Sequence, residues 1–403
     1  MATAKAARPS AARAAAGDAS SNASTSAPRR ARKTEAHGEA GGDGAQGVAP
    51  SAIREEAVVI TATVPSYPAD AYTHGELGLT ADGLTAMYRN MLLQRRFEER
   101  AAQMYGKQKI AGFLHLYIGQ EAVSTGAATA IEVGKDSVIT AYRDHGIGLA
   151  LGMTAREGMA EMFGRVGGSS HGKGGSMHFF KESVGMYGGH GIVGGHVPVG
   201  VGMAFAHKYK GDGGLSLTFL GDGAVGQGAV HEALNLAGLF DCPAIVVIEN
   251  NGYAMGTSIQ RAFSQPEFVR LAVGYGIDAM IVNGMDVLTV TKALRDAAAL
   301  ARAGKPVLVE MRTYRYRGHS MSDPQKYRTK EELDAKKEED PILRLKAYLL
   351  EHKLSTNEAL DALDEEVKAE VLDAVEFADA SPLPALEDAY ADVYVQQDYP
   401  FLK

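Results

Sequence analysis

The spacing of apolar residues predicts a helix in the first third of this chain and an alternation of strands and helices later. Near residue 80, apolar residues begin to recur at intervals of three and four, the pattern of an amphipathic helix. This stripe consists of Leu84, Met87, Tyr88, Met91 and Leu92. After Gly214, short apolar runs alternate with helix-length segments. We expect strands over 215–220, 244–249, 279–284 and 306–315, and helices over 228–240, 266–275 and 287–303.

This alternation predicts an α/β fold. Continuous apolar strands separated by helices are typical of a mostly parallel sheet that helices cover on both faces. We expect one such domain over residues 66–403, with a helical C-terminal extension over 331–403. Ser355 and Glu358 have the spacing of a capping box for a helix in that extension. Ligands of such folds bind at the carboxyl ends of the strands.

Residues 1–65 are predicted to be a disordered tail. They are dominated by Ala, Ser, Gly and Arg, with almost no large apolar side chain before Ile53. Such a segment cannot bury enough surface to offset its ordering entropy. It reads as the solvated tail of a bacterial protein, which implies a cytoplasmic location. The alternative is an organellar transit peptide, with the mitochondrial matrix as the location. Asp18 argues against it, because transit peptides are poor in acidic residues.

Composition narrows the partners of the chain. Among 403 residues the net charge is −8 with mixed signs, so no basic surface for nucleic acid is expected. No apolar run approaches the length of a bilayer span, so no membrane segment is expected. Cys242 is the one cysteine, which excludes an internal disulfide and fits a reducing compartment. We therefore expect a soluble intracellular protein.

Two segments rich in Gly and His, 167–180 and 185–202, are predicted to be loops in which the backbone approaches a neighbour closely. The second contains Gly189, Gly191 and Gly194 in the G-x-G-x-x-G spacing of dinucleotide sites. That fingerprint requires a strand before it and an acid at the end of the next strand. The flanking sequences predict no strand, so an NAD-dependent oxidoreductase is the disfavoured alternative.

An acid and an amide follow two strands that are consecutive in the predicted sheet. Asp222 lies between two glycines after the strand 215–220, and Asn251 follows the strand 244–249. The carboxyl ends of neighbouring parallel strands meet at one edge of the sheet, beside the N-terminus of the intervening helix, which favours anions. One carboxylate with neutral oxygens suits Mg²⁺ that is also bound by phosphate. Two ordinary turns are the alternative for either motif taken alone.

The two motifs together resemble the thiamine-diphosphate motif: Gly-Asp-Gly at 221–223, 26 intervening residues, then Asn250-Asn251. Further segments are similar to the alpha subunits of the decarboxylating component of pyruvate dehydrogenase complexes, and this resemblance spans about residues 70–395. These segments are GFLHLYIGQEA (112–122), TAYRDHG (140–146), GKGGSMH (172–178), GGHGIVGG (188–195) and YRGHSMSDPQKYR (316–328).

The resemblance implies a role for each matching residue. Mg²⁺ is expected on Asp222, Asn251 and the main chain of Tyr253. The diphosphate is expected on Tyr142, Arg143 and His319 and on the backbone of Gly223 and Ala224. Gly191 would approach the aminopyrimidine, Val193 would be the apolar wedge that bends the cofactor, and His319 and His115 would act at the reaction centre. Ser320 matches a serine that is phosphorylated in mitochondrial relatives, but an ordinary loop hydroxyl is favoured here.

The resemblance also implies partners. Thiamine enzymes need a glutamate on the aminopyrimidine ring, and this chain offers no convincing candidate; Glu121 is the nearest. We therefore expect a separate beta subunit in an α2β2 heterotetramer. The product would pass to the lipoyl domain of dihydrolipoyl acetyltransferase, with pyruvate as substrate. The alternatives are a branched-chain 2-oxo acid or acetoin dehydrogenase alpha subunit, and a non-catalytic assembly subunit.

Overall fold

The computed structural model describes residues 64–393, so the predicted tail over residues 1–65 lies almost entirely outside it. The division into that tail and a domain from residue 66 stays a prediction. No helix within residues 64–393 is both long and apolar enough to cross a bilayer.

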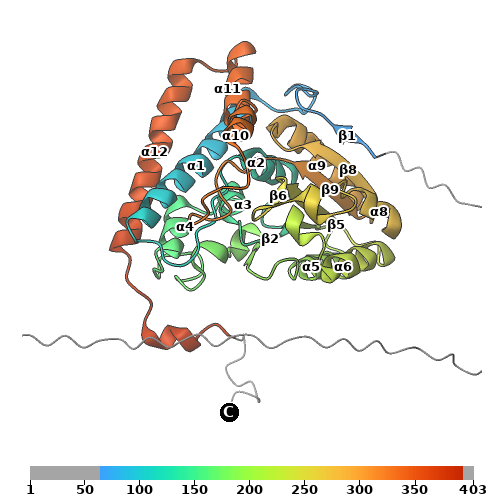
Figure 1. Cartoon of the computed structure of the whole chain (residues 1–403), viewed down its shortest axis with the longest axis horizontal. Helices are drawn as coiled ribbons and strands as arrows, with labels where there is room; N and C mark the ends of the chain where they lie inside the picture. The colour runs from blue at the N-terminus through green and yellow to red at the C-terminus, as the bar shows by residue number, and fades with distance from the viewer. Residues whose placement is uncertain (1–63, 394–403) are drawn as a thin grey trace, which may run out of the picture. The chain divides into compact units, whose positions relative to one another are not determined.

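A seven-stranded sheet, parallel throughout, forms the centre of the described chain (Figure 1). Its strand order is β1-β8-β9-β5-β4-β2-β3, so some neighbouring strands, such as β1 and β8, are far apart in the sequence. The strands are β1 (Ser66–Tyr67), β2 (Ser137–Ala141), β3 (Met186–His190), β4 (Ser216–Gly221), β5 (Ala244–Asn250), β8 (Asp278–Asn283) and β9 (Val307–Arg312). A small antiparallel pair, β6 (Tyr253–Ala254) and β7 (Thr257–Ser258), follows β5.

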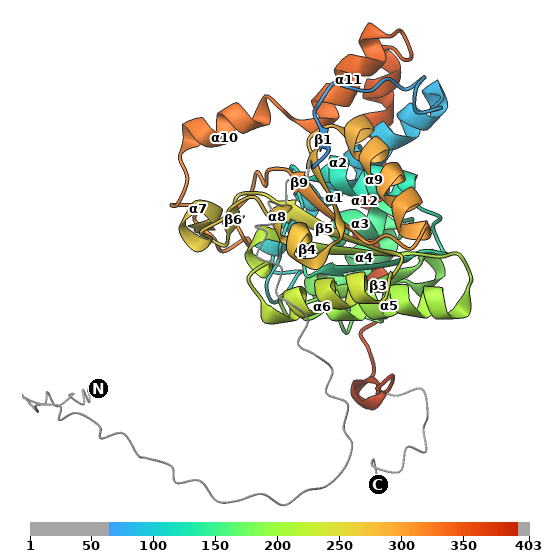
Figure 2. The same ribbon diagram turned by 90° about the vertical axis from the view of Figure 1, so that its right-hand side faces the viewer.

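Helices cover both faces of the sheet, as the alternation of apolar runs predicted. In Figure 2, α5 and α6 lie side by side below the sheet, and α1, α2, α3 and α9 lie on the opposite side. The helices are α1 (Ala81–Gly106), α2 (Glu121–Ala130), α3 (His145–Ala150), α4 (Ala155–Met162), α5 (Val197–Lys210), α6 (Gly228–Leu239), α7 (Ile259–Ala262), α8 (Arg270–Tyr275), α9 (Val287–Arg302), α10 (Lys330–Lys337), α11 (Pro341–Glu351) and α12 (Asn357–Ala380).

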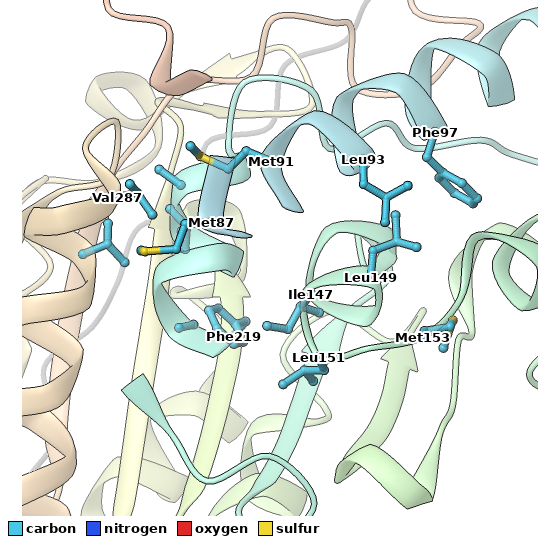
Figure 3. Close-up of a cluster of buried hydrophobic side chains, with 14 of the residues drawn as sticks. Met87, Met91, Leu93, Phe97, Ile147, Leu149, Leu151, Met153, Phe219 and Val287 are labelled. Carbon is cyan, nitrogen blue, oxygen red and sulfur yellow. The ribbon is translucent and has the colours of Figure 1, made fainter. Parts of the chain in front are cut away.

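Strand residues supply two separate cores because successive side chains point to opposite faces. Leu217 and Phe219 of β4 join the larger core beneath α1, α2 and α9, part of which Figure 3 shows. Leu220 of the same strand joins the smaller core beneath α5, α6 and α8. Apolar side chains of the central strands are therefore buried on both faces of the sheet, which is why their apolar runs do not simply alternate with polar residues.

The C-terminal part is helical as predicted, but one boundary differs. Helix α12 packs along α1 and α4 (Figure 1) and buries Val367 and Val371. Its N-cap is Thr356, whose hydroxyl accepts from the backbone N–H of Ala359. The capping box expected at Ser355 is therefore wrong by one residue. Ser355 and Thr356 could each serve as the N-cap, so the packing of the helix decides which of them does.

The second glycine-rich segment is not a loop throughout. Residues 186–190 form the edge strand β3, which pairs in parallel with β2, and residues from Val197 onward form α5. The expectation of no strand before the G-x-G-x-x-G sequence is therefore wrong. The sequence MYGGH does not indicate a strand by itself, because glycine has little β propensity. These residues form a strand because they pair with β2.

Candidate active site

The acid and the amide lie at the same edge of the sheet. β4 and β5 are adjacent and in register, with Gly221 paired to Glu249, so Asp222 and Asn251 follow immediately at their carboxyl ends. Residues 222–224 form a 3-10 turn that packs against β6. A Cβ on Gly223 would lie 2.5 Å from Cβ of Ala254, so glycine permits this close packing.

A cavity of about 440 Å³ opens at this edge, and every site residue predicted from the sequence borders it. Those residues come from six separate segments of the chain. They are His115, Tyr142, Arg143, Gly191, Val193, Asp222, Gly223, Ala224, Asn251, Tyr253 and His319. The cavity also has walls that the sequence did not indicate, including Gln120, Met177, Glu249, Met255 and Arg315.

Asp222 has an oxygen available for a cation. Its side chain is 2% exposed; Oδ1 accepts the backbone N–H of Gly223 at 2.7 Å, and Oδ2 has no partner among the described residues. Burial raises the pKa of this carboxyl, against the hydrogen bond from Gly223. A buried carboxylate oxygen without a partner is costly unless a ligand satisfies it. Asp222 therefore fits a metal ligand.

Asn251 supplies the neighbouring amide. It is buried, its Oδ1 accepts the backbone N–H of Tyr253 at 3.3 Å, and its Nδ2 donates to Oε1 of Gln120 at 3.3 Å. Within residues 64–393 no cluster of three His, Cys, Asp or Glu side chains could hold a metal. A set of one carboxylate, one amide and one main-chain carbonyl is of a different kind, and it suits Mg²⁺ that keeps phosphate and water ligands.

Arg143 provides a buried positive charge. Its Nη1 donates to the carbonyl of Leu116 at 2.5 Å and its Nη2 to the carbonyl of His319 at 2.9 Å. Burial, followed by repulsion from Arg315, lowers the pKa of Arg143 to about 10, so the guanidinium remains charged at neutral pH. Arg143 thus joins the two histidine-bearing segments and leaves other donors for an anion.

His115 and His319 both border the cavity, and their rings lie edge to face. Their ring centroids are 5.1 Å apart, and the Tyr142 ring lies 4.6 Å from His115. Burial, and then the charge of Arg143, lowers the pKa of His115 to about 3 and that of His319 to about 4. Nδ1 of His115 is buried without a partner in the described chain. Both rings are therefore neutral at neutral pH. Each can donate a hydrogen bond at one ring nitrogen and accept one at the other.

The loop that carries His319 is held by its own side chains. Asp323 accepts the backbone N–H of His319 at 2.6 Å and the hydroxyl of Tyr327 at 2.7 Å. Arg315, which the sequence did not single out, donates to that same Tyr327 hydroxyl at 3.0 Å. Oγ of Ser320 lies 3.0 Å from Oγ of Ser322. The role of Ser320 stays a prediction.

The glycines of the first glycine-rich segment approach a protein carboxylate, and of residues 167–180 only Met177 borders the cavity. Glu161 of α4 is fully buried and accepts four backbone N–H groups, two on each oxygen. The donors are Ser170, Gly172, Gly174 and Gly175, at 2.7 to 3.2 Å. The sequence indicated close approach but not this partner, because a glutamate within a short helix reads as a solvated residue.

The second glycine-rich segment does border the cavity, through Gly191 and Val193. In a dinucleotide fingerprint the third glycine allows a helix to pack against its own strand. Here a Cβ on Gly194 would instead meet Gln227 at 2.9 Å, at the start of α6. The dinucleotide interpretation thus lacks this packing, although a strand does precede the motif.

Two further acidic residues, Glu121 and Glu249, differ in whether they border the cavity. Glu121 pairs with Arg95 at 2.5 Å and does not border the cavity, so it serves the structure. Glu249, which the sequence analysis missed, does border it and accepts a hydrogen bond from the hydroxyl of Tyr117. Burial raises the pKa of Glu249 to about 7. As the second-last residue of a buried strand, it could have been identified by the same rule that identified Asp222.

Comparison with known proteins adds a family to this geometry. A model of the dehydrogenase E1 component matches residues 89–387. The pyruvate dehydrogenase E1 component subunit alpha of Zymomonas mobilis is 52% identical over 314 residues, covering 77% of this chain and 88% of that protein. The Rhizobium meliloti subunit of that name is 51% identical over 308 residues, covering 76% and 88%. The mitochondrial subunit alpha-1 of Arabidopsis thaliana is 45% identical over 315 residues, covering 78% and 80%.

Proposed function

The chain belongs to the dehydrogenase E1 component family, and from that premise we propose how its cavity serves pyruvate decarboxylation. It acts as the alpha subunit of the pyruvate-decarboxylating component of a pyruvate dehydrogenase complex. The branched-chain 2-oxo acid and acetoin alternatives are not favoured, since the relatives described above are named for pyruvate. The family implies dependence on thiamine diphosphate.

The observation that carries the proposal is the unpartnered Oδ2 of Asp222 beside Asn251 on the cavity wall. Asp222, Asn251 and the main chain of Tyr253 would hold Mg²⁺. Tyr142, Arg143 and the backbone of Gly223 and Ala224 would bind the diphosphate, because fixed donors and a buried cation stabilise phosphate. Gly191 would leave room for the aminopyrimidine, and Val193 would support the bend of the cofactor.

When bound, thiamine diphosphate supplies the nucleophilic carbon and the electron sink that decarboxylation of a 2-oxo acid requires. The residues of this chain would orient the cofactor and hold or accept protons. His115 and His319 would each hold a proton at one ring nitrogen and accept at the other, since burial keeps them neutral. Arg143 fixes the backbone on which both stand.

Exposed apolar side chains at the mouth of the cavity support the proposal of a partner chain. Phe113, Ile192 and Met255 are large apolar side chains that are 62%, 79% and 64% exposed, and Met255 borders the cavity itself. Exposed apolar side chains around a site are typical of a surface that another protein covers. We propose that a beta subunit covers this mouth in an α2β2 heterotetramer and supplies the glutamate for the aminopyrimidine. The lipoyl domain of dihydrolipoyl acetyltransferase would then accept the acetyl group, in the cytoplasm.

The decisive test is Asp222→Ala in the chain co-expressed with its beta subunit. We expect Mg²⁺-dependent binding of thiamine diphosphate, measured by calorimetry, to be lost while circular dichroism stays unchanged. Asp241→Ala is the control, because that aspartate is exposed and does not border the cavity. Unchanged cofactor affinity in Asp222→Ala would refute the metal site. Turnover of pyruvate, 2-oxoisovalerate and acetoin by the unmodified tetramer tests the substrate.

A further inference from the structure

Gln120 occupies an unusual position for a glutamine. It is 1% exposed, borders the cavity and stands at the N-cap of α2. Its side chain makes no capping hydrogen bond, so the helix does not use the amide. Burying an amide without using it for the helix costs free energy unless other partners are present. Its two amide atoms therefore point to another role.

The oxygen of Gln120 is hydrogen-bonded to the side chain of Asn251. Oε1 of Gln120 accepts the Nδ2–H of Asn251 at 3.3 Å, across 131 positions of sequence. A cation can bind only the oxygen of an asparagine amide, and the Nδ2 end would repel it. Because Gln120 holds the Nδ2 end, Oδ1 of Asn251 is left with one backbone donor, Tyr253, and a second lone pair free.

The side-chain nitrogen of Gln120 is the second feature of this residue. Nε2 is buried and has no hydrogen-bond partner among residues 64–393. A buried amide N–H without an acceptor is costly, so the site is complete only when a ligand oxygen reaches it. The bound metal brings such oxygens, from phosphate or from water.

The backbone under Gln120 is rigid. Gly119 has φ +104°, and a Cβ there would lie 2.4 Å from the carbonyl oxygen of Tyr314. The N–H of Gly119 donates to Glu121 at 3.0 Å, and Glu121 is paired with Arg95, which also binds Asp340 at 2.9 Å. A buried ion network and a position that only glycine can occupy thus hold Gln120 in place.

We propose that Gln120 is a positioning residue for the metal site: it orients Asn251 for Mg²⁺ and donates Nε2–H to an oxygen of the metal-bound ligand. This inference rests on the proposed function. Removal of a residue that orients a metal ligand typically weakens metal binding about tenfold to hundredfold. The effect is on binding, so activity need not be the readout.

The test compares Gln120→Met, Gln120→Glu and Gln94→Met in the α2β2 assembly. Gln94 is the matched control: it is a fully buried glutamine on α1 whose amide bonds Asn90, Ser124 and Thr125, away from the cavity. Mn²⁺ is titrated by electron paramagnetic resonance at saturating thiamine diphosphate. The cofactor is then titrated by calorimetry at saturating Mg²⁺.

We expect Gln120→Met to raise the dissociation constant of Mn²⁺ about tenfold or more, while Gln94→Met lowers thermal stability and leaves that constant unchanged. Gln120→Glu keeps an acceptor for Asn251 and loses the donor. It should therefore retain Mn²⁺ affinity within about threefold and lose affinity for thiamine diphosphate. Wild-type Mn²⁺ affinity in Gln120→Met, or an equal loss in Gln94→Met, overturns the proposal. If the unmodified assembly binds neither ligand, the proposed function itself fails.

Discussion

The two glycine-rich segments look alike in sequence, yet they have different neighbours. In the first, over residues 167–175, four backbone N–H groups converge on the carboxylate of Glu161. In the second, over residues 188–195, the backbone borders the cavity, and a Cβ on Gly191 would meet only the His178 ring, 3.3 Å away. One segment is closed around the protein's own acid, and the other is open to a ligand.

This difference shows what glycine density can and cannot indicate. Glycine permits close approach to the backbone, and in the first segment the space is already filled: a Cβ on Gly172 would lie 2.5 Å from the backbone of Gly164. Around Gly191 the space remains open on the cavity side. Substitutions in the two segments should therefore be read by different measurements, stability for the first and cofactor affinity for the second.

The largest effect is expected for Glu161→Gln. An amide can accept at one end only, so its NH₂ group would face N–H donors that the carboxylate now satisfies. We expect the free energy of unfolding, measured with urea, to fall by about 3 kcal/mol. Glu182→Gln, at an exposed glutamate, is the control. A loss within about 0.5 kcal/mol for Glu161→Gln, the range of an ordinary surface change, would contradict this role.

A smaller and more selective effect is expected from alanine at the two compared glycines. Gly172→Ala forces a Cβ onto a residue with φ +75° and should cost about 2 kcal/mol of stability. Gly191→Ala should leave urea denaturation nearly unchanged and raise the dissociation constant of thiamine diphosphate about tenfold, or about 1.4 kcal/mol. Should Gly191→Ala instead destabilise the chain and bind the cofactor normally, the contrast between the segments is wrong.

The smallest effect concerns a second anchor of the first segment. His145 lies 3.0 Å from the carboxylate of Glu98, and its other ring nitrogen lies 2.9 Å from the carbonyl of Ser176, just after the glycines. Burial opposes the charged ring, but attraction to Glu98 and the hydrogen bond outweigh it, and the pKa of His145 is raised.

Because that pKa is raised in the folded state, the stabilisation is complete below the ordinary value of about 6.5 and is lost as pH rises through the folded-state value. Thermal stability should therefore decrease as the pH rises above about 6.5. Glu98→Gln should be less stable at the lower pH and show a flatter profile. An identical pH slope in the two proteins would exclude this ion pair as the cause.

Much of the fold follows from the sequence because strand and helix periods are local. The continuous apolar runs predicted β4, β5, β8 and β9 and their helical cover, and the family comparison agrees with the α/β class. The placement of Asp222 beside Asn251 also followed, since neighbouring parallel strands end at one edge. Local pattern therefore determined four strands of the sheet and the edge at which the cavity opens.

Tertiary structure alone decided the partners of residues that are distant in sequence or that read as surface positions. Glu161 and Gln120 are polar residues whose burial depends on how α4 and α2 dock, and nothing in their neighbours' periodicity indicates it. The same holds for β3, whose glycines form a strand only because β2 pairs with them. Hydrogen bonds between such groups depend on the packing of whole elements, and a pattern along one segment does not contain that information.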